Sequence, residues 1–170
     1  HFLSRSSDPI TIENNSIHHL LVDQNNNLWI GTNYNKSKNE LGLIRYNLTT
    51  GNVKQFSHNP SDPNSLLDNR ISALYEDQQG QILIGTFQSG FHIYDPKTES
   101  LKRMNFDSNN PNRLHAPYTE SSVFGQDPSV RLIHQDQNGD YWIGTSGKGI
   151  NYFNTKTNIF KEHSFNLVNP

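Results

Sequence analysis

The chain has no cysteine among its 170 residues. This absence excludes disulfide bonds, thiol nucleophiles and zinc or iron–sulfur sites with thiolate ligands. It also favours an oxidising compartment, in which a free thiol is a liability.

Long apolar runs and basic clusters are missing as well. A membrane-spanning helix needs about 20 mostly apolar residues, so none is expected in this segment. The net charge of −2 gives no support to a nucleic-acid partner. The first residues are polar, so no secretion signal is expected there.

Asparagine is abundant instead, at 23 residues, and aromatic residues make up 11% of the chain. Asparagine favours tight turns and left-handed backbone positions. A chain of 170 residues is long enough for one domain with a core. We therefore expect an all-β domain in which many short strands are joined by tight turns.

One motif occurs three times, and the whole organisation follows from it. Residues 29–32 read Trp-Ile-Gly-Thr, residues 83–86 Leu-Ile-Gly-Thr and residues 142–145 Trp-Ile-Gly-Thr. An aspartate stands eight residues before each glycine, at Asp23, Asp77 and Asp136. The basic unit is 48 residues, with six extra residues in the first copy and eleven before the third. A period of this size is typical of β-propellers and solenoids.

Each unit is expected to contain four antiparallel strands, which is the composition of a β-propeller blade. The apolar positions of the first strand are spaced by three, so a short helix is not excluded by the pattern alone. An open sandwich of about twelve strands is the alternative fold. The predicted division is an outer strand and linker of a preceding blade (1–9), a blade (10–57), a linker with a blade (58–107), and a linker with an insertion and a blade (108–170).

The turns carry their own signals. The repeated aspartates are expected to cap turns by accepting backbone hydrogen bonds, a structural rather than a metal-binding role. Gly51 and Asn158 suit a left-handed position after the third strand, whereas Glu99 at the equivalent place does not. The His18-His19 pair is expected to point to opposite faces of a strand, which argues against joint chelation of a metal.

The repeat resembles the two-component regulator propeller family. The resemblance rests on the aspartate, the turn glycine, the Leu-Trp-Ile-Gly-Thr run, the following Gly-Leu and the Tyr-Asn or Tyr-Asp end of the third strand, and it covers nearly the whole chain. It implies the periplasmic sensing half of an inner-membrane receptor with a histidine kinase or diguanylate cyclase output. Some family members sense oligosaccharides. The membrane would be reached only through other parts of the receptor, and three blades would be part of a larger propeller.

Strand parity places both insertions at the same end of the blades, and long loops on a rigid scaffold often carry binding residues. The alternative is that these loops are solvated and bind no ligand, and that the channel holds only water. Arg131, equivalent to His18 and Ser72, is expected to border the central channel and to bind a carboxylate or an acidic sugar. The candidate ligand-binding residues are Tyr34, Lys36, Arg70, His115, Tyr118 and Arg131.

No catalytic residues, metal site or cofactor are predicted, since no nucleophile–base order, phosphate loop or zinc spacing occurs. The main hypothesis is a non-catalytic sensor segment that binds a small molecule, possibly an oligosaccharide. A propeller enzyme (a lyase or a glycan hydrolase) and a protein-assembly scaffold are the alternatives. Self-association is also expected, because three blades should expose apolar faces near Trp29 and Trp142.

Overall fold

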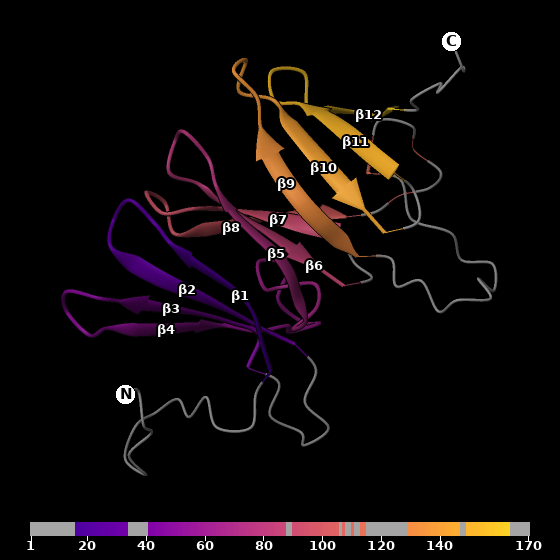
Figure 1. The fold of residues 1–170 in the computed structure, drawn as a ribbon. Coiled ribbons are helices and arrows are strands. Elements are labelled where there is room, and N and C mark those ends of the chain that lie inside the picture. Colours follow the sequence, from indigo (N-terminus) through magenta and orange to yellow (C-terminus); the bar gives the residue numbers. More distant parts are fainter. Residues whose placement is uncertain are drawn as a thin grey trace.

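The structure, a computed structural model, describes residues 16–33, 41–87, 90–105, 107, 110, 113–114, 129–146 and 149–163. Regular structure in these residues is entirely β, in three antiparallel sheets of four strands (Figure 1). The strands are β1 (Ser16–Val22), β2 (Asn27–Asn33), β3 (Leu43–Asn47), β4 (Val53–Phe56), β5 (Ile71–Glu76), β6 (Ile82–Thr86), β7 (Gly90–Asp95), β8 (Ser100–Asn105), β9 (Val130–Gln135), β10 (Tyr141–Thr145), β11 (Gly149–Asn154) and β12 (Ile159–His163).

Strands follow one another in chain order within each sheet, so each sheet is the propeller blade that the repeat predicts. The first strands of neighbouring blades lie side by side, β1 next to β5 and β5 next to β9. The hydroxyl of Ser72 in β5 donates a hydrogen bond of 2.7 Å to the carbonyl of Val130 in β9. Within the described residues, no helix has the length and apolar character needed to cross a membrane.

Each first strand contains a β-bulge at the same place. Ile17 pairs with Thr32 and His19 with Gly31, so the register of the strand pair skips His18. The registers of the other two blades skip Ser72 and Arg131 in the same way. One extra residue explains why the apolar positions are three apart and not two, and it removes the helical alternative. The bulge also breaks the alternation expected for His18 and His19, whose ring centroids lie 6.5 Å apart.

The three repeated aspartates cap their turns as predicted. In each, one carboxylate oxygen accepts the backbone N–H groups two and four residues further on, at 2.8–3.1 Å. The residue before the second of these N–H groups has a positive φ, at Asn26, Gly80 and Gly139. Asparagine and glycine tolerate this conformation best, so the turn chemistry of all three copies agrees with the sequence.

The second oxygen of each aspartate accepts a hydrogen bond from a side chain of another strand. Asp23 accepts the indole N–H of Trp29 at 2.8 Å, and Asp136 accepts that of Trp142 at 3.2 Å. In the middle blade leucine replaces this tryptophan, and the hydroxyl of Tyr141 from the following blade donates to Asp77 at 2.7 Å. Burial and the Asp77 carboxylate raise the pKa of Tyr141, which keeps this hydroxyl a donor. The hydrogen bond to this second oxygen therefore lies within one blade at Asp23 and Asp136, whereas at Asp77 it links two blades.

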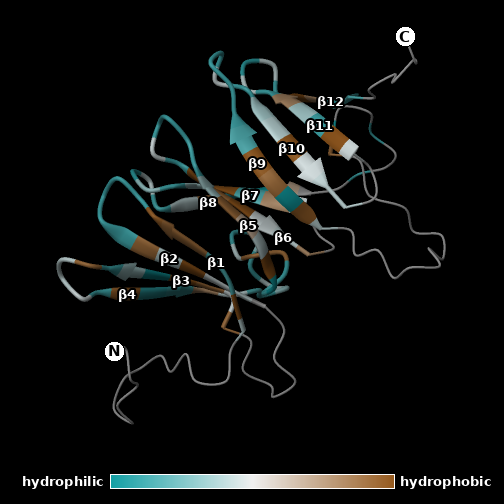
Figure 2. Cartoon of the chain, in the orientation of Figure 1, coloured by the Kyte–Doolittle hydropathy of each residue, from teal (hydrophilic) through white to brown (hydrophobic). Residues whose placement is uncertain are grey.

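Apolar side chains fill the space between adjacent blades, in one cluster for each interface. Figure 2 shows that hydrophobic positions lie along the strands, whereas several of the hairpin turns are hydrophilic. Trp29 is fully buried, with its ring 5.7 Å from Phe56 of its own blade and 5.3 Å from Tyr94 of the second blade. The exposed apolar face expected at Trp29 or its neighbours therefore does not include Trp29 itself, because the tryptophan of the motif faces the following blade. Trp142 lies half-buried on the free side of the third sheet, beside Tyr152 and His163.

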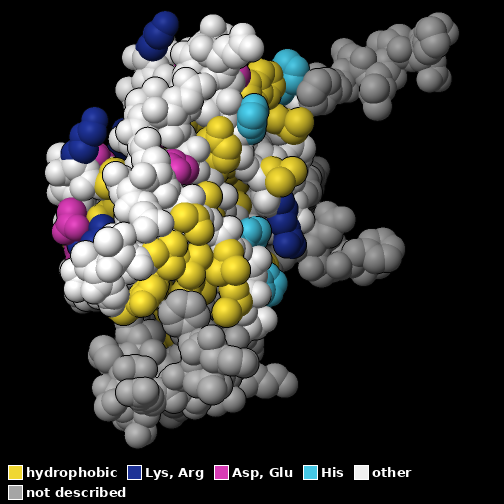
Figure 3. Space-filling view, turned by 60° about the vertical axis from the view of Figure 1, so that its left-hand side comes forward, with side chains coloured by type: hydrophobic (Ala, Val, Ile, Leu, Met, Phe, Trp, Pro, Cys, Tyr) yellow, Lys and Arg dark blue, Asp and Glu magenta, His cyan; other side chains and the backbone are white. Residues whose placement is uncertain are grey.

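The opposite end of the array is apolar and exposed. Figure 3 shows hydrophobic side chains gathered on the side of the molecule where the first blade lies. They include Ile17, Leu20, Val22 and Val53, each between 40% and 62% exposed. An apolar sheet face of this kind is typical of a surface that contacts another protein element.

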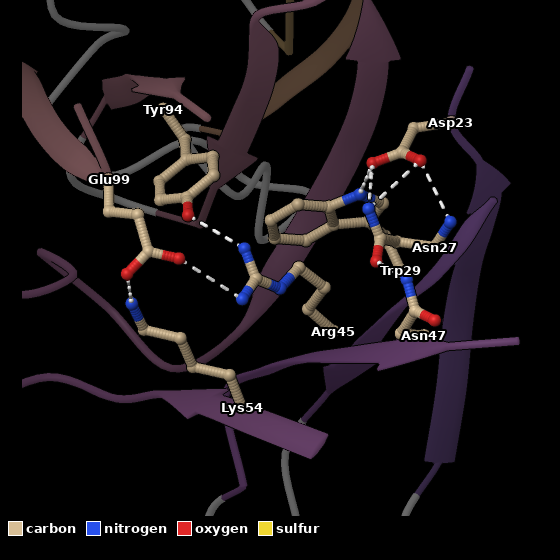
Figure 4. A network of polar contacts seen from close by, with 8 residues as sticks. All are labelled: Asp23, Asn27, Trp29, Arg45, Asn47, Lys54, Tyr94 and Glu99. Carbon is tan, nitrogen blue, oxygen red and sulfur yellow. Dashed lines mark hydrogen bonds and ion pairs between the residues drawn. The ribbon is translucent and has the colours of Figure 1, made fainter. Parts of the chain in front are cut away.

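Glu99 adopts the left-handed conformation that its residue type disfavours, with a φ of 51°. Its carboxylate accepts hydrogen bonds from Lys54 at 2.9 Å and from Arg45 at 3.2 Å, both in the preceding blade (Figure 4). These bonds lower the pKa of Glu99, so it stays ionised. The contact between blades explains why a glutamate is kept where glycine or asparagine would fit the backbone better.

Candidate functional site

Four of the six predicted ligand residues, Tyr34, Lys36, His115 and Tyr118, lie outside the described residues. The other two, Arg70 and Arg131, lie next to each other in space. Their guanidinium carbons are each 5.5 Å from the centre of the Phe87 ring. Phe87 follows the last residue of β6, and its backbone N–H donates to the carbonyl of Arg70 at 3.1 Å. The site is therefore centred on an aromatic ring with two cations close to it.

Arg70 is already engaged by an acidic side chain. Its Nε donates to Asp68 Oδ1 at 3.0 Å, and its Nη2 donates to Asp68 Oδ2 at 2.6 Å. The backbone N–H of Arg70 donates to the same carboxylate at 2.9 Å. A forked pair of this type fixes the guanidinium and neutralises its charge. Arg70 thus shapes the site more than it offers a free donor set.

Arg131 has a different environment. It is the bulge residue of β9 and its side chain is exposed. Within the described residues, no carboxylate lies within salt-bridge distance of its guanidinium. β-Bulges re-aim side chains and are frequent next to functional sites. Arg131 is consequently the group best placed to donate two parallel hydrogen bonds to a carboxylate, sulfate or phosphate.

Histidines from the first blade complete this surface. The ring of His18, the bulge residue of β1, lies edge-on to Phe87 at 6.4 Å. Burial lowers the pKa of His19, and the nearby His18 and Arg131 lower it further. Neutral imidazole at this position can accept or donate a hydrogen bond. Bulge residues of the first and third blades thus converge on one aromatic ring of the second blade. Among the described residues, no group of three His, Asp or Glu side chains could hold a metal ion.

Phe87 was not among the predicted site residues. It follows directly after the repeated motif, where the other copies have Asn33 and Ser146. An aromatic residue that replaces polar ones at one repeat position is a signal that could have identified it. The bulge was detectable in the same way, from three-residue spacing in a strand.

The repeats match a known family over residues 11–34, 65–88 and 125–147, described as two component regulator propeller. The repeats of this chain belong to the two-component regulator propeller family. Each match covers the first strand, the aspartate turn and the Gly-Thr end of the second strand. A comparison with curated proteins finds no match.

Solved structures with the same fold are parts of much larger proteins. One is the extracellular domain of the hybrid two-component system BT3049 from B. thetaiotaomicron, with 25% identity, a TM-score of 0.57 and 94% of this chain covered. Another is PorZ, a surface component of the type-IX secretion system of Porphyromonas gingivalis, with 15% identity, a TM-score of 0.58 and 91% of this chain covered. The chain spans 25% and 22% of the lengths of these two proteins. PorZ at this identity shows the shared fold alone.

Proposed function

We propose that these blades form part of an extracytoplasmic, periplasmic sensor propeller that binds a small anionic ligand at the end carrying Arg131. The observation that carries the proposal is the exposed bulge arginine beside an aromatic ring, at the strand end from which both insertions emerge. Support for a sensor role comes from the family of the repeats and from the BT3049 structure, which is an extracellular two-component domain.

An acidic oligosaccharide has the chemistry that this surface would recognise. Its carboxylate or sulfate would accept two hydrogen bonds from Arg131, while a sugar ring would pack against aromatic side chains. Tyr34, Lys36, His115 and Tyr118 in the insertions would extend the same surface. Arg70, held by Asp68, would help to keep the Phe87 ring in place.

Signalling in this proposal is a change in how propellers pack. Ligand contact at the insertion end would alter the association of blades in a receptor dimer, and the change would reach a histidine kinase or diguanylate cyclase output. The open apolar side of the first blade, with Leu20 and Val22, is assigned to contact with another blade.

The test is Arg131→Ala in the full receptor, compared with Arg131→Lys and with Lys97→Ala as an exposed-cation control at the opposite end of the blades. The assay measures thermal shift and affinity with acidic and matched neutral oligosaccharides, together with reporter output. Loss of a charge-assisted hydrogen bond should weaken acidic ligands by about 10- to 100-fold. Lysine should restore part of the affinity. Unchanged binding and signalling in Arg131→Ala would place the ligand elsewhere.

A further inference from the structure

A cleft of about 490 Å³ lies between the second and third blades. It is at the end of the blades that carries the short hairpin turns, away from Arg131. Ile93 and Lys102 of the second blade line it on one side, and Tyr141, Phe153 and Asn158 of the third blade line the other. The volume falls within the range of about 300–1,000 Å³ that is usual for small-molecule sites.

The first interface shows what normally fills this space. Arg45 is paired across strands with Lys54, and its side chain reaches the second blade. It donates to the hydroxyl of Tyr94 at 2.9 Å and to Glu99 at 3.2 Å (Figure 4). Lys54 donates to the same carboxylate at 2.9 Å. One carboxylate therefore sits between two cations in the first interface.

In the second interface, three of these four side chains are replaced and only the lysine is the same. The cross-strand pair equivalent to Arg45 and Lys54 is Ile93 and Lys102. On the facing blade, phenylalanine (Phe153) replaces the tyrosine and asparagine (Asn158) replaces the glutamate. The replacements remove a guanidinium, a hydroxyl and a carboxylate, and they leave the cleft open.

Lys102 has consequently lost the carboxylate that its counterpart holds. Its ammonium donates to the Asn158 side-chain oxygen at 3.4 Å, and no carboxylate among the described residues lies within salt-bridge distance. Asp95 is the acidic residue of the cleft lining. Its carboxylate accepts a hydrogen bond of 2.8 Å from the backbone N–H of Lys97 in the same turn. Asp95 pairs with Ser100, two residues along β7 from the Ile93–Lys102 pair.

We propose that this cleft binds a small ring-shaped carboxylate. The ligand carboxylate takes the place that Glu99 has in the first interface and accepts hydrogen bonds from Lys102 and from the amide of Asn158. The ring packs on Ile93 and Phe153, which form the apolar part of the wall. The hydroxyl groups of Ser100 and Thr155 also line the cleft. Ser100 is hydrogen-bonded to Thr98 at 2.8 Å and Thr155 donates to Asp140 at 3.0 Å, so each keeps acceptor capacity for a hydroxyl group of the ligand. This site is independent of the Arg131 surface, because it lies at the opposite end of the strands.

The test uses the whole chain and four probes in two matched pairs. 4-Hydroxybenzoate is compared with 4-hydroxybenzamide, and glucuronate with glucose, by NMR titration. Each pair changes the carboxylate while keeping the ring, and the two pairs separate an aromatic from a sugar ring. We expect one carboxylate or both to bind with shifts in cleft residues, and each neutral partner to bind at least about tenfold more weakly.

Two variants decide whether the cleft is responsible. Lys102→Gln removes the charge at an exposed position and should weaken carboxylate binding about tenfold or more. Ile93→Arg combined with Asn158→Glu rebuilds the ion pair of the first interface inside the cleft and should abolish binding. Lys54→Gln is the matched control and should leave binding intact, with circular dichroism confirming the fold of each variant. Equal binding of acid and neutral probes, no binding, or binding unaffected by either cleft variant would overturn the proposal.

Discussion

Gly85→Ala tests how closely the blades must approach. Gly85 belongs to the repeated Ile-Gly-Thr motif in β6, next to the first strand of the third blade. A Cβ atom on residue 85 would lie 2.9 Å from the Cβ of Ala73, and 3.0 and 3.1 Å from the Cγ1 and Cβ of Val130. Two of these atoms are Cβ atoms fixed to the backbone, so no side-chain rotation relieves the overlap. Both β5, which carries Ala73, and β9, which carries Val130, would have to move away.

The size of the effect follows from two opposing contributions. Carbon atoms in contact normally lie about 3.5–4.0 Å apart, so the new methyl group overlaps by about 0.5–1 Å. Overpacking of this kind destabilises a core by about 1–3 kcal/mol. Replacing glycine by alanine within a strand recovers about 0.5–1 kcal/mol of backbone entropy. The two contributions together span about 0–2.5 kcal/mol, so the net expectation for Gly85→Ala is a loss of about 1 kcal/mol.

The chain contains its own control at Gly144. The same atom on Gly144 would lie 3.5 Å from the Cβ of Leu132, an ordinary contact, so only the entropic gain remains. Urea unfolding should show Gly85→Ala destabilised and Gly144→Ala unchanged or slightly stabilised. Val130→Ala should cost less in the Gly85→Ala background than alone, because it removes one of the clashes. Equal effects of the two glycine substitutions would refute this account of the motif.

Two further predictions concern buried polar contacts. Tyr141→Phe removes the hydroxyl that donates to Asp77 and should lower the free energy of unfolding in urea by about 1–3 kcal/mol. An unchanged urea midpoint would show that this link between blades does not stabilise the fold. Burial lowers the pKa of His92 to about 4, and its Nε2 accepts the backbone N–H of Leu67 at 2.9 Å. The unfolded chain protonates His92 more readily than the folded chain does. The contribution of neutral His92 to the free energy of unfolding is therefore fully present above pH 6.5 and declines by about 3 kcal/mol as the pH falls from 6.5 to about 4. Urea midpoints measured across this range should show that contribution in the parent chain and not in His92→Gln.

Much of the fold could be predicted because the same sequence pattern occurs in three copies. The spacing of aspartate, turn residue and Ile-Gly-Thr placed the first two strands of every blade, and the turn chemistry at Asp77 and Gly80 behaves as expected. The three-residue spacing of apolar positions is caused by the bulge, although the same spacing also fits a helical period. A bulge and a helical turn both break the alternation of a strand, so spacing alone does not separate them.

Contacts between blades could not be predicted in the same way. The side chain of Trp29 faces the following blade and not the preceding one. This choice depends on the direction in which the blades follow one another around the axis, and the sequence does not specify that direction. Tyr141 reaches Asp77 only because leucine stands at position 83, so the substitution and its compensation lie in different repeats. Glu99 has no local reason to be glutamate and is explained by Arg45 and Lys54 of the preceding blade.

The two blade interfaces show how a repeat can change its chemistry without changing its backbone. The cross-strand pairs Arg45–Lys54 and Ile93–Lys102 occupy the same register positions, yet one is closed by Glu99 and the other is an open cleft. Three side-chain replacements are sufficient for the difference, because the hydrogen-bonded ladders and turn caps do not depend on them. The same reasoning applies to the bulges, where a residue without an opposite partner can vary freely. Serine at position 72 ties two blades together, whereas arginine at position 131 projects to the surface. Positions that the repeat does not need for its own folding are therefore the ones where ligand recognition is expected.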